Sequence, residues 1–158
     1  MTGSGVTARL AELGLHLPPV AAPVAAYVPA VVEGGLVWTS GQLPFVDGEL
    51  PATGVVGAGE GFVPPEDAAG LARICALNAL AAIGSVTDLD QVARIVKVVG
   101  FVASAPGFAG QPQVVNGASQ LLGEVFGDAG RHARSAVGVA ALPLGAPVEI
   151  EVVASLSR

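Results

Sequence analysis

The segment from residue 131 to residue 151 constrains the fold of this 158-residue chain more than any other. Its composition predicts two β segments around a turn that contains Pro143 and Gly145. In the second segment, Glu149 and Glu151 alternate with the apolar residues Val148, Ile150 and Val152. Because residues two apart in a strand share a face, both carboxylates point one way and the apolar side chains point the other, toward a core. The pattern therefore predicts a strand with one buried face and one polar face.

Two interpretations of the charges in this segment stay open. The first is a terminal hairpin whose polar face lies in water, an ordinary arrangement for antiparallel strands. The second is a pocket that combines Arg134 with one of the glutamates. A guanidinium presents a planar fork of donors that matches a carboxylate, and a nearby glutamate can orient a water molecule. Such a pair suits a small acid that is held at one end and hydrolysed at the other.

The composition is unusually apolar for a soluble monomer of this size, with 13% charged residues and a mean hydropathy of +0.67. Apolar surface in excess of one core usually marks a partner interface, so we expect a homo-oligomer. The length favours a single domain, 1–158. Residues 1–24 form an N-terminal extension of that domain, with a short helix over 6–14 and a proline-rich segment after it.

Several classes of protein are disfavoured by the same sequence. The charge-free stretches 13–32 and 98–123 both contain prolines, which argue against membrane-spanning helices. No basic-then-apolar leader is visible, which favours a cytoplasmic protein. A net charge of −6 without a basic patch argues against nucleic-acid binding as the function. One cysteine and two histidines without ligand spacing predict no disulfide, metal or cofactor.

The remaining elements follow from periodicity and from glycine and proline positions. Strands over 25–32 and 36–43 are joined by Gly34 and Gly35, which predicts a hairpin. Helices are expected over 68–83 and 112–126, and between them the strand 91–103 is apolar enough to be buried on both faces. Cys75 lies on the apolar stripe of the first helix and is expected in the core. The order of elements is β-β-α-β-α-β-β.

Two short motifs in this order resemble a known family. One is Ser40-Gly41-Gln42 near the end of the second strand. The other runs from Ala133-Arg134-Ser135 through Leu142-Pro143 to Glu149-Ile150-Glu151, with Asn116 between the two motifs. Together they resemble the Rid family (reactive intermediate deaminase, or YjgF-like), and the resemblance extends from about residue 27 to residue 154.

The resemblance implies an α+β fold, in which a two-layer chorismate-mutase-like (YjgF-like) mixed β-sheet carries two helices on one face, here with the short N-terminal helix added. It implies homotrimers with sites between subunits. The implied reaction is hydrolytic deamination of 2-imino or enamine acids to 2-oxo acids and ammonia. Arg134 would bind the carboxylate of this small-molecule substrate and Glu149 would position the attacking water. The other implied pocket residues are Tyr27, Ser40, Asn116 and Ala136, the last through its backbone carbonyl.

Each of these residues also has an ordinary structural interpretation. Tyr27 can be a strand residue with its hydroxyl in water, Ser40 can cap a turn, and Asn116 can be a surface amide. The chain is longer than typical family members, by the N-terminal helix and by the loop 46–65. His132 stands where the better-known members often have proline, and no role is assigned to it.

Two alternative functions remain beside the deaminase. The same pocket could serve a non-catalytic trimer that binds or senses small carboxylic acids, and some relatives carry an older ribonuclease label, which the acidic charge disfavours. There is also a geometric difficulty. If 142–147 made a tight hairpin, Arg134 would lie about 20 Å along the sheet from the position opposite Glu149. Cooperation between the two side chains then requires a bulge, a bent strand or a second chain.

Overall fold

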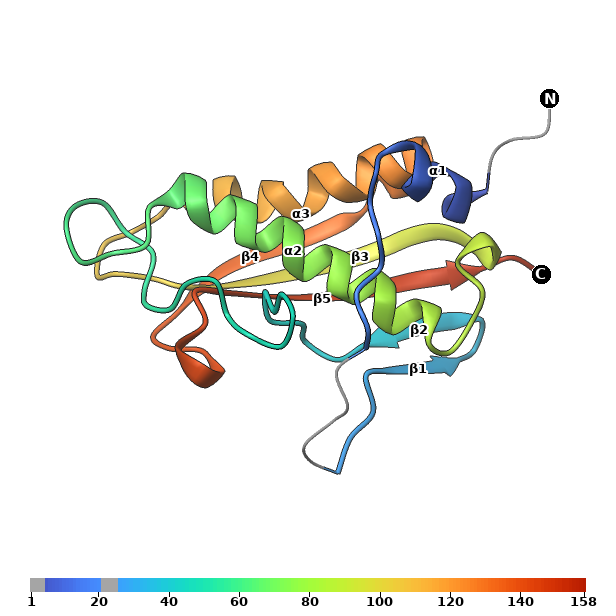
Figure 1. Ribbon diagram of the computed structural model, residues 1–158, viewed down its shortest axis with the longest axis horizontal. Coiled ribbons are helices and arrows are strands. Elements are labelled where there is room, and N and C mark those ends of the chain that lie inside the picture. The colour runs from blue at the N-terminus through green and yellow to red at the C-terminus, as the bar shows by residue number, and fades with distance from the viewer. Residues whose placement is uncertain (1–4, 21–25) are drawn as a thin grey trace.

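The computed structural model describes residues 5–20 and 26–158, and in this part the chain has the expected two-layer α+β architecture (Figure 1). Its helices and strands follow the order α1 (Val6–Glu12), β1 (Ala30–Glu33), β2 (Leu36–Thr39), α2 (Pro65–Gly84), β3 (Val92–Ala103), α3 (Gln111–Phe126), β4 (Ala133–Val139) and β5 (Val148–Leu156). The strand order is β1-β2-β5-β3-β4, with β3 and β4 parallel and the other pairs antiparallel. Figure 1 shows α2 and α3 lying together over one face of this sheet.

The ends of these elements follow from local chemistry. Gly34 and Gly35 both have positive φ and form the tight turn of the β1–β2 hairpin. Helix α2 begins with a proline, which has no amide hydrogen to leave unpaired, and acidic Glu66 and Asp67 lie in its first turn near the positive end of the helix dipole. Helix α3 ends at Gly127, which adopts a positive φ of 59°.

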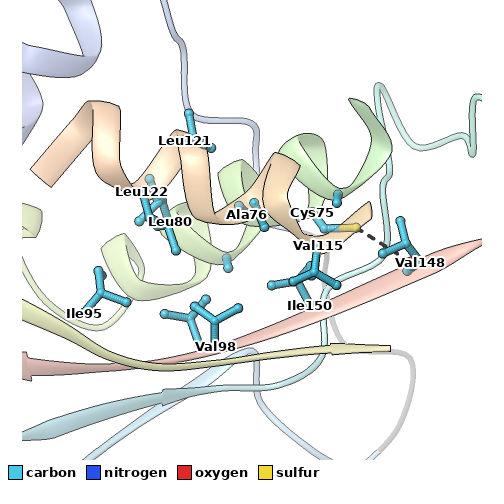
Figure 2. Close-up of a cluster of buried hydrophobic side chains, with 14 of the residues drawn as sticks. Cys75, Ala76, Leu80, Ile95, Val98, Val115, Leu121, Leu122, Val148 and Ile150 are labelled. Carbon is cyan, nitrogen blue, oxygen red and sulfur yellow. Dashed lines mark hydrogen bonds between the residues drawn. The ribbon is translucent and has the colours of Figure 1, made fainter. Parts of the chain in front are cut away.

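The core lies between the helix pair and the sheet (Figure 2). Its largest fully buried side chains include Leu80, Ile83, Ile95, Leu121, Leu122 and Ile150. The helices approach closely at Gly117, where a Cβ atom would overlap the backbone carbonyl of Ala69 on α2. Helix α2 is long and apolar enough to cross a membrane by length and composition, but 56% of that stretch is buried within the fold, as in a core helix.

The opposite face of the sheet is not covered by any described element. We call it the open face; it carries Trp38, Lys97, Val99, Phe101, Val137, Glu149 and Glu151. Strand β3 was expected to be buried on both faces, and this expectation is wrong for the described chain because only one of its faces meets the helices. Trp38 is 50% exposed and Val137 is 43% exposed, so the open face presents large apolar side chains to solvent beside its charged residues.

The segment 131–151 forms two strands, as expected, but they do not pair with each other. Strand β3 lies between β4 and β5, so the loop 140–147 passes the end of β3 instead of closing a hairpin. Backbone bonds hold that loop there, from the Ala103 amide to the Pro147 carbonyl and from the Ser104 amide to the Val139 carbonyl. The alternation of charged and apolar residues predicts a strand but does not select its neighbours.

The first two strands are shorter than expected. Strand β1 begins at Ala30, directly after Pro29, and Tyr27 therefore precedes the strand. Strand β2 ends at Thr39, and two residues further on, past Ser40 and Gly41, Gln42 makes an isolated antiparallel bridge to Ile150. The Ser40-Gly41-Gln42 motif therefore lies alongside β5, next to Glu149.

Candidate functional site

Arg134 is held in place by two side chains of helix α3. Its Nη1 donates to Asn116 Oδ1 at 2.7 Å and to Ser119 Oγ at 3.3 Å, and its Nη2 donates to the Pro112 carbonyl at 3.3 Å. In the sheet register Arg134 is aligned with Val98, which is fully buried beneath the helices. The guanidinium therefore lies on the helix side of the edge strand β4.

Part of the Arg134 guanidinium remains available to a ligand. Its Nε and the second hydrogen of Nη2 have no acceptor among residues 5–20 and 26–158, and no carboxylate in that part of the chain lies within 4.0 Å of it. An arginine that is already oriented but lacks a counterion presents a ready fork for a carboxylate.

His132 supports this arrangement through Ser119. The His132 Nδ1 lies 2.6 Å from the Gly130 carbonyl, and its Nε2 lies 2.9 Å from Ser119 Oγ. A carbonyl can only accept, so Nδ1 carries the hydrogen and, in the neutral ring, Nε2 accepts from the Ser119 hydroxyl. Burial, and then the positive charge of Arg134, lowers the pKa of His132, against the opposing effect of the Gly130 bond. The neutral ring thereby fixes the hydroxyl that contacts Arg134.

These side chains line an open hollow of about 360 Å³ beside strand β4. The lining residues are Asn116, Ser119, Gly123, Gly130, Arg131, His132 and Arg134. We call Arg134, Asn116, Ser119 and His132 the arginine cluster.

Glu149 lies on the open face in a second group of residues. Its carboxylate packs against the Cα of Gly41, where a Cβ atom would overlap an oxygen of the carboxylate. Burial, and then the charge of Glu151, raises the pKa of Glu149. The Ser40 hydroxyl donates to the Val28 carbonyl at 2.6 Å, which ties the segment carrying the exposed Tyr27 to the end of β2. We call Glu149, Gly41 and Ser40 the glutamate cluster.

Within one chain the two clusters do not meet. Arg134 is aligned with Val98 of β3, whereas Glu149 is aligned with Phe101, three residues further along and on the other side of β3. These offsets separate the two Cα atoms by roughly 14 Å. The side chains also point to opposite faces of the sheet, since Glu149 lies on the open face. The structure brings Arg134 together with Asn116 and leaves Glu149 apart from both.

The remaining expected site residue is Ala136, which is aligned with Gly100 and faces the helix layer like Arg134. The contact to Ser119 was not anticipated from the sequence. Its signal was present, because Ser119 follows Asn116 by three residues and residues at that spacing share one face of a helix.

No group of His, Cys, Asp or Glu side chains that could hold a metal ion is found among the residues that the structure describes. Cys75 is fully buried, its Sγ lies 3.7 Å from the Val148 carbonyl (Figure 2), and burial raises the pKa of the thiol. It belongs to the core, as expected.

The sequence and the structure are both similar to those of known proteins. The model of a family described as YjgF/chorismate mutase-like, putative endoribonuclease, matches residues 7–156. Protein TCP17 of Trypanosoma cruzi is 44% identical over 155 residues, which cover 97% of this chain and 95% of that protein. The crystal structure of a putative endoribonuclease from Shewanella oneidensis has a TM-score of 0.90 and 31% identity, covering 97% of this chain and 100% of that one. The crystal structure of E. coli TdcF with bound serine has a TM-score of 0.62 and 27% identity, covering 89% and 94%.

Proposed function

The chain belongs to the YjgF/chorismate mutase-like family, and from this membership and the two clusters we propose that it hydrolyses 2-imino or enamine acids to 2-oxo acids and ammonia. The observation that carries the proposal is Arg134, a guanidinium oriented by Asn116 and Ser119 without a carboxylate within 4.0 Å in the described chain. An oriented guanidinium without a counterion is well suited to bind the carboxylate of a small acid.

The reaction needs a group that accepts a proton from water. With the carboxylate of the substrate on Arg134, a water oxygen attacks the imine carbon, and Glu149 takes the proton that the water loses. Glu149 passes this proton to the imine nitrogen, which gives a tetrahedral carbinolamine. It then takes the proton of the new hydroxyl group and delivers it to the same nitrogen as the carbon–nitrogen bond breaks, so that the carbonyl of the 2-oxo acid forms and ammonia leaves. The raised pKa of Glu149 brings this carboxyl closer to neutral pH, where a group that both accepts and returns a proton works best.

A second copy of the chain is required for this reaction. Arg134 and Glu149 point to opposite faces of one sheet, so a substrate held by Arg134 needs the glutamate of a neighbouring subunit. The open face supports association, because its large apolar side chains Trp38 and Val137 are about half exposed. We propose a homotrimer in which the arginine cluster of one subunit meets the glutamate cluster of the next.

The names of the similar proteins indicate two classes of ligand, a small amino acid and RNA. The TdcF structure contains serine, a small amino acid with a carboxylate, which agrees with a carboxylate-binding arginine. Names of other relatives point to endoribonuclease activity. The net charge of −6 disfavours that activity, since RNA binding relies on cations that neutralise phosphates.

The test is the decay of 2-iminopropanoate, generated in the assay by an amino-acid oxidase. Wild-type protein should accelerate the decay, and Arg134→Ala should lose about 100-fold or more in kcat/KM, because the carboxylate is no longer held. Arg134→Lys keeps the charge without the planar fork and should recover only part of the rate. Arg158→Gln, which makes the same change in net charge as the alanine variant, is the control. Undiminished turnover by a folded Arg134→Ala protein would disprove the proposal.

A non-catalytic binding module is the second candidate, and it rests on the same arginine. It predicts saturable binding of 2-oxo acids that Arg134→Ala abolishes, with no acceleration of imine decay by the wild-type protein. Measuring 2-oxo acid binding alongside imine decay distinguishes the two.

A further inference from the structure

The hollow beside Arg134 contains a second arginine. We propose that Arg131 binds the distal carboxylate of a substrate that carries two acid groups, so that the protein prefers dicarboxylic 2-imino acids to monocarboxylic ones. Arg131 lines the same hollow as Arg134 and lies three residues before it in the chain. The inference rests on the proposed function for its reaction, but its binding step can be tested without turnover.

The distribution of charge supports an anion in this hollow. The chain has only 7 Lys and Arg residues against 13 Asp and Glu, yet no acidic residue is among the described residues that line the hollow. Arg94 is not among the residues that line the hollow, but it lies next to Arg131, since its Nη2 donates to the Arg131 carbonyl at 3.1 Å. Three of the seven cations therefore gather at one corner of an acidic protein.

Two other arginines form closer ion pairs than Arg131 does. Arg9 pairs with Glu12 at 3.0 Å, and Arg73 pairs with Glu124 at 2.7 Å. The closest carboxylate of Arg131 is Asp128, whose Oδ1 lies 3.7 Å from Nε, and the side chains of this pair are 83% and 100% exposed. An exposed pair at that distance contributes little, so a ligand carboxylate can replace it at small cost.

The hollow also has room for a longer molecule. Two of its lining residues, Gly123 and Gly130, carry no side chain, and a Cβ at Gly123 would meet no atom within 4 Å. Its volume of about 360 Å³ lies within the range of small-molecule sites. A three-carbon acid on Arg134 leaves the region around Arg131 unfilled, whereas a five-carbon diacid has a second carboxylate to place there.

The decisive experiment compares the binding of two 2-oxo acids, the products of the proposed reaction, by titration calorimetry at low salt. The wild-type protein should bind the five-carbon 2-oxo diacid about five-fold more tightly than the three-carbon 2-oxo monoacid, the upper range for a partly exposed ion pair. Arg131→Gln should abolish this ratio, because it weakens binding of the diacid more than binding of the monoacid. Arg131→Lys should retain part of the ratio. Arg158→Gln, which alters the net charge equally, should keep the full ratio, and added salt should shrink it in the wild type.

Equal affinities for the two acids in the wild-type protein would overturn the inference, and so would a preference that Arg131→Gln leaves intact. The same comparison in imine decay, as a ratio of kcat/KM values, separates the two proposals. A wild-type protein that prefers the diacid in binding but hydrolyses neither imine would refute the deaminase and support the assignment of Arg131. Thermal melts of each variant check that the protein is folded.

Discussion

The position of the Glu149 carboxylate depends on a glycine in another strand segment. Gly41 has no side chain, and the carboxylate of Glu149 occupies the space where a Cβ would be. Gly41 does not have a positive φ, so its backbone conformation does not require glycine. Glycine is needed here because a side chain would displace the Glu149 carboxylate. In this chain, the Ser40-Gly41-Gln42 motif therefore provides the space that the Glu149 carboxylate occupies.

Gly41→Ala is therefore expected to displace the Glu149 carboxylate and to reduce imine hydrolysis at least about ten-fold, as misplaced catalytic groups do. The free energy of unfolding should change by only about 1 kcal/mol, because the displaced atoms are the far end of a flexible side chain. Activity and urea denaturation measured on one preparation check both parts. Unaltered activity with an intact fold would show that the position of this carboxylate does not matter.

The raised pKa of Glu149 also predicts how stability depends on pH. The folded chain holds this proton to a higher pH than the unfolded chain, whose glutamate titrates near 4.3. Stability from protonated Glu149 is therefore fully present below about pH 4.3 and is lost as pH rises through the folded pKa. Glu149→Gln stays uncharged, so it should melt at a higher temperature than the wild type at neutral pH, and the difference should vanish near pH 4.

Melting curves of the two proteins across pH 4–8 measure this difference. A Glu149→Gln variant that is less stable than the wild type at neutral pH would contradict the prediction.

Glu151→Gln removes the second cause of the raised pKa of Glu149, so the acid limb of the kcat/KM profile should move to lower pH in that variant.

Helices α2 and α3 pack closely because Gly117 lies against the backbone of Ala69. The helix layer in turn positions the arginine cluster, since Asn116 and Ser119 flank Gly117 on α3 and both accept from Arg134. The distance between the two helices therefore affects the site as well as the core.

Gly117→Ala should cost about 1–3 kcal/mol in the free energy of unfolding, because the new methyl group meets backbone that cannot rotate away. Gly70→Ala is the matched control, since Gly70 lies in α2 with open space around its would-be Cβ. It should stabilise the protein by roughly 0.5–1 kcal/mol, the usual gain for alanine in a helix. Urea denaturation of both variants gives the comparison, and a neutral Gly117→Ala would show that the helices can separate freely.

The existence of the elements could be predicted because each depends on its own residues. Apolar periodicity and the flanking Pro64 and Gly127 place α2 and α3 within a few residues of their observed ends. Strand neighbours could not be predicted in the same way. The insertion of β3 between β4 and β5 depends on the parallel crossover through α3, and no residue of segment 131–151 encodes it.

The candidate site was predictable in part for the same reason. The motifs name Arg134, Asn116 and Glu149, but the sheet order decides which of them meet. Arg134 and Asn116 are linked by a 2.7 Å bond across β4 and α3, whereas Glu149 lies beyond β3 on the other face. His132 had no assigned role, because its contact to Ser119 joins a loop to a helix and follows from the fold alone.

At the scale of the whole molecule, one chain carries two separate parts of the proposed site. The arginine cluster lies at the edge strand β4 on the helix side, and the glutamate cluster lies on the open face. Within the described part of the chain, one sheet face exposes large apolar side chains and the edge strand β4 pairs on one side only, and both features favour association with further copies. The central claim of the proposed mechanism is that each half is completed by a different subunit.

Complementation between two inactive variants tests this claim most directly. Arg134→Ala and Glu149→Gln are each expected to be inactive, and the two proteins are unfolded, mixed in equal amounts and refolded together. If every site takes its arginine from one subunit and its glutamate from the next, random mixing restores both residues in about a quarter of the sites. Imine decay should then recover to about a quarter of the wild-type rate. A mixture that forms mixed oligomers but stays as inactive as its components would contradict a shared site.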